Sequence, residues 1–255
     1  MNENILSNFK KELGYVNSTN QYIEMSIRIT KKEHGLDLRN DLHNLAQSVN
    51  LTVSTLAEDY MCRISKSYIV SIHSCFENFL KSFKLLPGSP TNISQNKKKQ
   101  EDDWLNWTLN IAFESIESDI KNDVAICDYY RAIRNCIVHN GEYLTEQKNK
   151  YGLIKNTSDL RLKAPNGLDS LTFDDQVLFS RAACNVATNI FKKSKYDTNT
   201  IIENYRTNLI ELIKPFQEKE SHQKAVKKAK HFIGLIYPEL TDVNWEYEVA
   251  KLFGD

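Results

Sequence analysis

The sequence predicts an all-α protein, and three observations lead to this fold class. Turn-forming residues are scarce, with 8 glycines and 5 prolines in 255 residues, and this scarcity suits long helices with few connections. Apolar residues recur at spacings of three and four over most of the chain, which is the period of an amphipathic helix. Hydrophobic residues make up 41% of the chain, enough to bury a sizeable core. We therefore expect one helical domain over residues 1–255.

The first half of the chain holds the longest apolar pattern. It covers residues 52–86, where aromatic and aliphatic side chains occupy more than one side of the expected helix. A helix of this kind is usually central in a bundle. Pro87-Gly88-Ser89-Pro90 ends it, and a polar loop over 87–100 precedes a further helix that starts at Glu101 and includes Trp104 and Ile116. Three shorter helices are expected before it, at 3–16, 18–34 and 36–49.

The second half is expected to be helical on both sides of a small insert. Residues 141–172 form this insert, which is either irregular or a hairpin, because Pro165-Asn166-Gly167 is a turn signal between two leucine pairs. The leucines are Leu160, Leu162, Leu168 and Leu171. The expected helices are 123–140, 173–195, 199–217, 220–236 and 243–253. We place the bundle core at about 52–195, with N-terminal helices 3–49 and C-terminal helices 199–253 packed on it.

Charge and cysteine usage restrict the class of protein. Lys plus Arg and Asp plus Glu both number 33, so nucleic acid can be bound only through a local basic patch. The five cysteines have no CxxC spacing and lie in apolar patterns, which predicts reduced core thiols in a reducing compartment. The first residues have no basic region and no long apolar run, and no stretch approaches 18 apolar residues, so we expect neither a signal peptide nor a membrane span. We expect a cytoplasmic protein with no membrane partner.

The helix expected at 123–140 divides its residues by chemistry. Each residue advances about 100° around the axis. One stripe is apolar and consists of Ile126, Tyr130, Ile133 and Ile137. The opposite stripe is polar and consists of Asp128, Arg131, Asn135 and His139. Arg134 lies on the flank between them, so two arginines, an amide and an imidazole share the polar side of a helix whose other side is core.

The run Arg134-Asn135-x-x-x-His139 resembles the signature of the HEPN superfamily, in which Arg is followed after four to six residues by His. A polar residue often directly follows the Arg in that family, as Asn135 does here, and the apolar helix at 67–86 is similar to the second helix of such bundles. The resemblance covers residues 64–142. One toxin branch continues the motif as His-x-Tyr, whereas Tyr143 stands two positions later, so the nucleotidyltransferase partner of that branch is not expected.

The resemblance implies an endoribonuclease that needs no metal and no cofactor. His139 is then general base or general acid at the ribose 2′-hydroxyl, and Arg134 holds the phosphate. Asn135 orients His139 or bonds the phosphate. The expected product ends in a 2′,3′-cyclic phosphate. Family members pair as homodimers around one cleft, act in antiviral defence, abortive infection or as toxins, and have regulatory protein partners.

Several residues keep two interpretations. Arg131, which we assign with Asn140 to RNA contact, either holds a neighbouring phosphate or forms a salt bridge with Asp128. Glu77 is either a supporting acid for Arg134 or, as we favour, an acid with an ordinary structural partner. Arg134 and His139 themselves can complement the helix dipole in a structural role. A non-catalytic HEPN-like module that binds a nucleotide or a protein is the alternative function, although inactive relatives usually lose the Arg or the His.

No metal-ligand set is expected, because the histidines are scattered and none pairs with Cys or carboxylate at ligand spacing. They are His34, His43, His73, His139, His222 and His231. A basic helical face near the C-terminus is either solvated, which we favour, or guides RNA. It consists of Lys224, Lys227, Lys228, Lys230 and His231.

Overall fold

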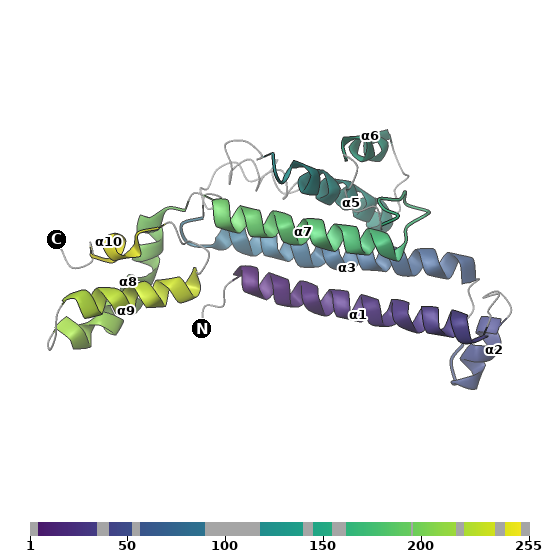
Figure 1. Cartoon of the computed structure of the whole chain (residues 1–255), viewed down its shortest axis with the longest axis horizontal. Coiled ribbons are helices and arrows are strands. Elements are labelled where there is room, and N and C mark those ends of the chain that lie inside the picture. The colour runs from purple at the N-terminus through teal and green to yellow at the C-terminus, as the bar shows by residue number, and fades with distance from the viewer. Residues whose placement is uncertain are drawn as a thin grey trace. The chain divides into compact units, whose positions relative to one another are not determined.

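The protein is helical for the most part, and its described residues contain no strand (Figure 1). The predicted all-α class is therefore confirmed. The helix expected from Glu101 lies outside the described residues, as do Asn140 and Leu160. A computed structural model describes residues 5–34, 41–52, 57–89, 118–139, 145–154, 162–194, 196–217, 222–237 and 243–250.

The chain divides into two compact units. The first, here called the motif unit, comprises Lys10–Phe76 and Ser118–Val186. The second, here called the terminal unit, comprises Met1–Phe9, Glu77–Glu117 and Ala187–Asp255. Three helices contribute residues to both units, and they are α1 (Ile5–His34), α3 (Ala57–Leu85) and α7 (Phe173–Lys193). The expectation of one domain with its core at 52–195 stays a prediction.

Helix α1 corrects one expectation, since two helices were expected at 3–16 and 18–34, whereas α1 is continuous from Ile5 to His34. Asn17 lies at the expected break and keeps helical backbone. Its amide donates to Ser180 Oγ at 2.7 Å and accepts from Gln176 Nε2 at 2.9 Å. Asn usually interrupts helices by bonding its own backbone. Here the side chain bonds α7 instead, so the backbone continues as helix.

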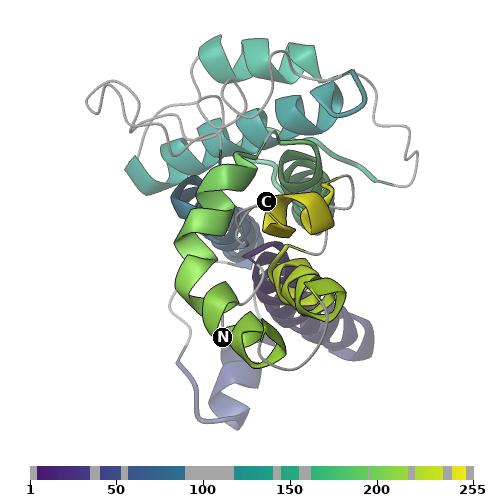
Figure 2. The same cartoon turned by 90° about the vertical axis from the view of Figure 1, so that its left-hand side faces the viewer.

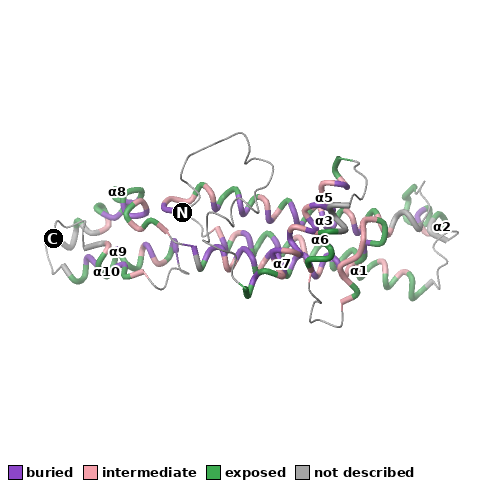
Figure 3. The backbone as a smooth tube through the Cα atoms, turned by 90° about the horizontal axis from the view of Figure 1, so that it is seen from above, coloured by how far each residue is buried: buried purple, intermediate pink, exposed green. Residues whose placement is uncertain are grey.

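Contacts at separated points fix the directions of the helices in the motif unit. Asn185 on α7 bonds Asp123 near the start of α5 (Lys121–His139), whereas Phe179 earlier on α7 stacks on Tyr130 later on α5. Helices α5 and α7 are therefore antiparallel. Both stacked rings are fully buried, and the buried residues of α3, α5 and α7 form the core (Figure 3). Burial of each such side chain stabilises the fold by roughly 1.5–3 kcal/mol.

A buried carboxylate joins α5, α7 and the segment before α7. Asp175 is 0% exposed. Its Oδ1 accepts from the Tyr130 hydroxyl and from the Asn166 backbone N–H, both at 2.7 Å. Its Oδ2 accepts from Asn166 Nδ2 at 2.8 Å and from the N–H and hydroxyl of Thr172 at 2.7 and 3.1 Å. Because Thr172 directly precedes α7, its bond with Asp175 is one half of a capping box.

Residues 162–172 of the insert are irregular, and the hairpin alternative is wrong for them. Residues 162–172 contain no strand, although Ser170 N–H donates to the Gly167 carbonyl in the expected turn. The backbone N–H groups of Asn166 and Thr172 donate to Asp175, so they are unavailable to a strand ladder. Helix α6 (Thr145–Leu153) was not expected. It has little amphipathic pattern of its own, and its side chains contact α5, where the rings of Tyr151 and Tyr129 lie 5.8 Å apart.

The terminal unit confirms the expected C-terminal helices. These are α8 (Thr198–Gln217), α9 (His222–Ile236) and α10 (Trp245–Ala250), which face the viewer in Figure 2. Gly88 follows the end of α3 with a φ of 71°, and a Cβ there would lie 2.5 Å from the Asp197 carbonyl oxygen. Only glycine fits this close approach. Asp197 N–H donates to the Gly88 carbonyl at 2.8 Å, which joins the end of α3 to the start of α8.

The remaining expectations concern α2 and the cysteines. Helix α2 (Asp41–Ser48) lies within the expected 36–49. Reduced core thiols were expected; all five cysteines have free thiols, but only Cys127 and Cys136 are buried, and Cys62, Cys75 and Cys184 are half-buried. Burial raises the pKa of the Cys75 thiol to about 11, and the charge of Glu12 adds to the effect. This thiol therefore stays protonated, and poorly nucleophilic, at neutral pH.

The Asp175 network predicts a large stability effect. Asp175→Asn places an NH₂ group against hydrogen-bond donors and leaves one acceptor oxygen for them. We expect the free energy of unfolding to fall by about 3 kcal/mol, measured by urea denaturation followed by circular dichroism. Asp169→Asn is the control, because this side chain is 88% exposed and lies 3.4 Å from Lys66; its effect should stay within about 0.5 kcal/mol. Equal unfolding midpoints for the two variants would contradict the assigned role of Asp175.

Candidate functional site

Helix α5 carries the predicted motif and is buried over more of its circumference than one stripe. Ile126, Tyr130 and Ile133 are buried as predicted, and Ile137 is half-buried. The buried face is widened by Val124, Cys127, Tyr129, Ala132 and Cys136. The predicted polar stripe consequently lies at the edge of the core, where Asp128, Arg131 and Asn135 are half-buried, and only His139 is exposed.

The start of α5 is held by α7. Asn185 Nδ2 donates to Asp123 Oδ2 at 3.1 Å. Burial raises the pKa of the Asp123 carboxyl, while the bond from Asn185 and the nearby charge of Arg181 oppose the rise. An acid in the first turn complements the positive end of the helix dipole. The motif, about three to four turns later, therefore belongs to a helix whose position is set by the core.

Arg134 is oriented by the residue that follows it. Its Nη1 donates to Asn135 Oδ1 at 3.1 Å, and both side chains are half-buried. The Nε atom of Arg134 is buried, and no described residue accepts a hydrogen bond from it. A buried charged donor without an acceptor is costly. An anionic ligand such as a phosphate would supply the missing acceptor oxygen.

His139 occupies the last turn of α5 and is exposed, beside Val138, which is 45% exposed. No hydrogen bond joins its ring to a described residue. An exposed imidazole at this position can reach a substrate and can serve as a general acid or base. The structure therefore brings Arg134 and Asn135 into contact and places His139 on the same helix, one turn beyond them.

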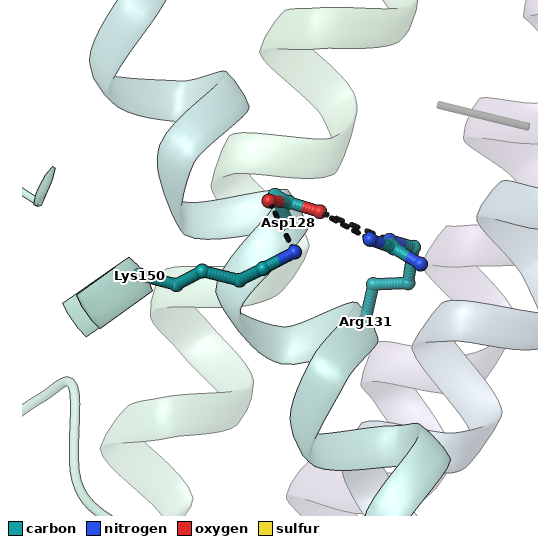
Figure 4. A network of polar contacts seen from close by, with 3 residues as sticks. All are labelled: Asp128, Arg131 and Lys150. Carbon is teal, nitrogen blue, oxygen red and sulfur yellow. Dashed lines mark hydrogen bonds and ion pairs between the residues drawn. The ribbon is translucent and has the colours of Figure 1, made fainter. Parts of the chain in front are cut away.

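Arg131 forms the salt bridge that was one of its two interpretations (Figure 4). Its Nε and Nη2 lie 3.0 and 2.8 Å from Asp128 Oδ1. Lys150, on α6, donates to the other oxygen of Asp128 at 2.7 Å. The three side chains are only 14–19% exposed. Asp128 therefore balances two cations at the edge of the core, and a phosphate would have to compete with it for Arg131.

The two remaining candidates differ in what the structure says of them. Glu77 Oε1 lies 2.9 Å from Lys81 Nζ, one turn later on α3, which agrees with the favoured structural interpretation. Asn140 lies outside the described residues.

On the basic face of α9, Lys230 pairs with Glu246 at 2.8 Å. The bond from Lys230 and its charge lower the pKa of the Glu246 carboxyl, so part of this face is neutralised by α10.

Sequence reasoning missed the partners that hold the site. Lys150 carries no motif, and only the packing of α6 brings it to Asp128. Asp175 had a detectable signal, because Thr172-x-x-Asp175 follows the pattern of a capping box with Asp in place of Glu. That pattern predicts the bond to Thr172 but not the one to Tyr130, which joins residues 45 positions apart.

Comparison with family models, with curated proteins and with solved structures finds no match for this chain. Among the described residues, no group of three His, Cys, Asp or Glu side chains is placed to hold a metal ion. No described helix is both long and apolar enough to cross a membrane. The likeness of Arg134, Asn135 and His139 to the HEPN signature is thus an expectation from sequence.

The Asp128 ion pairs predict a local effect on α6. In Asp128→Asn, two partly buried cations lose their negative partner, and we expect a loss of about 1–3 kcal/mol in stability. Amides of α6 should exchange with deuterium about tenfold faster, since α6 is the element that Lys150 attaches. Glu203→Gln is the control, because Glu203 and its partner Arg206 are 60% and 54% exposed and such pairs contribute little. If the deuterium exchange rates of the α6 amides do not change, the assigned role of Asp128 is contradicted.

Proposed function

We propose that the protein is an endoribonuclease whose reaction uses Arg134 and His139. The observation that carries the proposal is the Arg134–Asn135 contact, in which the arginine has a buried Nε without a described acceptor. The exposed His139 on the same helix adds a group that can transfer protons. An arginine with an unfilled donor and an accessible imidazole on the same helix are suited to a phosphodiester, which needs both charge stabilisation and proton transfer.

The proposed reaction is an internal transesterification. An imidazole removes the proton of the ribose 2′-hydroxyl, and the 2′-oxygen attacks the adjacent phosphorus. The bond from phosphorus to the 5′-oxygen breaks, and this oxygen takes a proton from an imidazolium. The products are a 2′,3′-cyclic phosphate and a 5′-hydroxyl. Arg134 stabilises the charge that develops on the phosphoryl oxygens, and Asn135 holds the guanidinium in place.

This reaction needs a base and an acid, and one chain offers a single histidine of this kind. We therefore include a homodimer in the proposal, in which two copies of His139 and Arg134 meet at one cleft. A role in phage defence or growth arrest, with a regulatory protein partner, is part of the same proposal and rests on the resemblance to HEPN proteins. The chemistry can be tested without knowledge of that role.

The first test is RNA cleavage in EDTA. Purified wild type, His139→Ala, Arg134→Lys and His43→Ala are incubated with total tRNA and ribosomal RNA, and products are resolved on denaturing gels. We expect His139→Ala to lower the cleavage rate about 10²- to 10⁴-fold. Arg134→Lys should lower it about 10- to 100-fold, because lysine lacks the planar fork. His43 is an exposed histidine on α2, so His43→Ala should cleave as wild type does.

Two results would oppose this mechanism. If His139→Ala cleaves as fast as wild type, the activity belongs to another site or to a contaminant. If no protein cleaves RNA, the non-catalytic binding module becomes the better account. Circular dichroism melts of each variant separate a lost catalytic group from a lost fold, since a surface histidine should change the melting temperature little.

The second test is the mass of the assembly. Sedimentation equilibrium at micromolar concentration should give twice the chain mass of 29.5 kDa, because the composite site needs two chains. His139→Ala should also sediment as a dimer, since one exposed side chain rarely determines an interface. A monomer that nevertheless cleaves RNA would exclude the composite site while leaving the ribonuclease proposal standing.

A further inference from the structure

A pocket lies between α1 and α7 in the motif unit. It measures about 380 Å³, at the lower end of the range of small-molecule sites, which is roughly 300–1,000 Å³. Leu13 and Val177 give it an apolar part, and most of its other lining residues have polar side chains. The polar lining includes Lys10, Asn17, Gln21, Ser180, Arg181 and Asn185. None of these residues belongs to the Arg134–His139 motif.

Charge and chemistry restrict what the pocket can hold. Lys10 and Arg181 are exposed cations, one on each of the two helices. Two such cations favour an anion, and a phosphate accepts from both. Asp123 lies close enough to Arg181 for the charge of the arginine to lower the pKa of the Asp123 carboxyl. No residue lining the pocket is aromatic, and the stacking surface that a nucleobase prefers is therefore missing.

Gln176, which lines this pocket, has a buried amide oxygen without a hydrogen-bond donor among the described residues. It lines the pocket and is only 2% exposed. Its Nε2 donates to Asn17 Oδ1 at 2.9 Å, which fixes the direction of the amide. Its Oε1 is buried and receives no hydrogen bond from a described residue. A buried amide oxygen of this kind needs an N–H or O–H donor, and a hydroxyl-bearing ligand would supply one.

Gly14 leaves the space open on the α1 side. It lies inside a helix, where glycine is less favourable than alanine or leucine. A Cβ built at Gly14 meets no atom within 4 Å, so no packing inside the protein requires glycine here. Because Gly14 also lines the pocket, the absence of its side chain keeps the cavity accessible.

From these observations we infer that the α1–α7 pocket binds a small phosphorylated polyol, of which a sugar phosphate is the simplest example. Lys10 and Arg181 bind the phosphate, and Gln176 Oε1 accepts from a hydroxyl of the polyol. Gln21 and the hydroxyl of Ser180, which accepts from Asn17 and still has its own proton to donate, offer further polar groups of the kind that polyols require. The inference does not depend on the ribonuclease proposal, because none of its observations involves the motif of α5.

The test uses ribose 5-phosphate and glucose 6-phosphate with the full chain, in isothermal titration and thermal melts. Binding is expected at concentrations up to ~10 mM, ten times the Kd of a weak ~1 mM site. Inorganic phosphate, ribose and adenosine monophosphate should each bind at least about tenfold more weakly, since each lacks one required feature or adds an unstacked base. Equal binding of phosphate alone, or of ribose alone, would overturn the assigned ligand class.

Matched variants locate the site. Gly14→Leu should abolish binding by filling the pocket, whereas Gly234→Leu, at a helical glycine in α9 with equally open surroundings, should leave it unchanged. Lys10→Gln should weaken binding about tenfold, the size of one lost charge-assisted bond, and Lys11→Gln, an exposed neighbour outside the lining, should not. Binding that survives Gly14→Leu would overturn the location.

A footprint gives a readout in the unmodified chain. Cys184 lines the pocket and is half-buried, and Cys62 is equally half-buried but does not line it. With ribose 5-phosphate bound, alkylation of Cys184 by N-ethylmaleimide should slow severalfold while alkylation of Cys62 keeps its rate, as followed by mass spectrometry. Equal rates at Cys184 with and without the ligand would oppose the inference. RNA is absent from every arm, so the outcome is independent of the cleavage tests.

Discussion

The fully buried carboxylate of Asp175 is the interaction on which the motif unit depends. A charge in the core is costly unless donors surround it, and five hydrogen bonds from three residues do so here. These donors come from α5, through Tyr130, and from the segment before α7, through Asn166 and Thr172. Because the loss of one partner leaves the others facing an incompletely satisfied charge, the helix, the segment and the start of α7 are held as a set.

This arrangement explains how a largely apolar helix can present a polar motif. The start of α5 is fixed through Asp123 and its middle through Tyr130, so its last turns are carried outward from a rigid base. Arg134 lies where burial decreases, half in the core and bonded to Asn135, and His139 lies where the helix becomes exposed. Preorganisation of this kind matters for catalysis, because donors held in place need no reorganisation when charge develops.

Local sequence patterns predicted the helices well, whereas contacts between residues distant in sequence could not be predicted from these patterns. The expected helices at 173–195, 199–217 and 220–236 match α7, α8 and α9, since each buries an amphipathic face. The break expected in α1 was wrong because Asn17 bonds α7 instead of its own backbone. The salt bridge of Arg131 was foreseen as an alternative, but its second cation, Lys150, was not, because α6 is held by α5 more than by its own sequence. The pocket likewise requires two helices to be packed together.

In the motif unit, some buried polar atoms have all their hydrogen-bond partners and others have none among the described residues. Asp175 receives every donor it can use, while the next residue, Gln176, keeps a buried oxygen without one. On α5, the Tyr130 hydroxyl donates to Asp175, whereas the buried Nε–H of Arg134 has no described acceptor. Proteins seldom leave such atoms unpaired unless a ligand or water completes them. The two atoms have opposite requirements, since Arg134 needs an acceptor and Gln176 needs a donor. Arg134 does not line the pocket that Gln176 lines, and we therefore assign the two atoms to two different ligands.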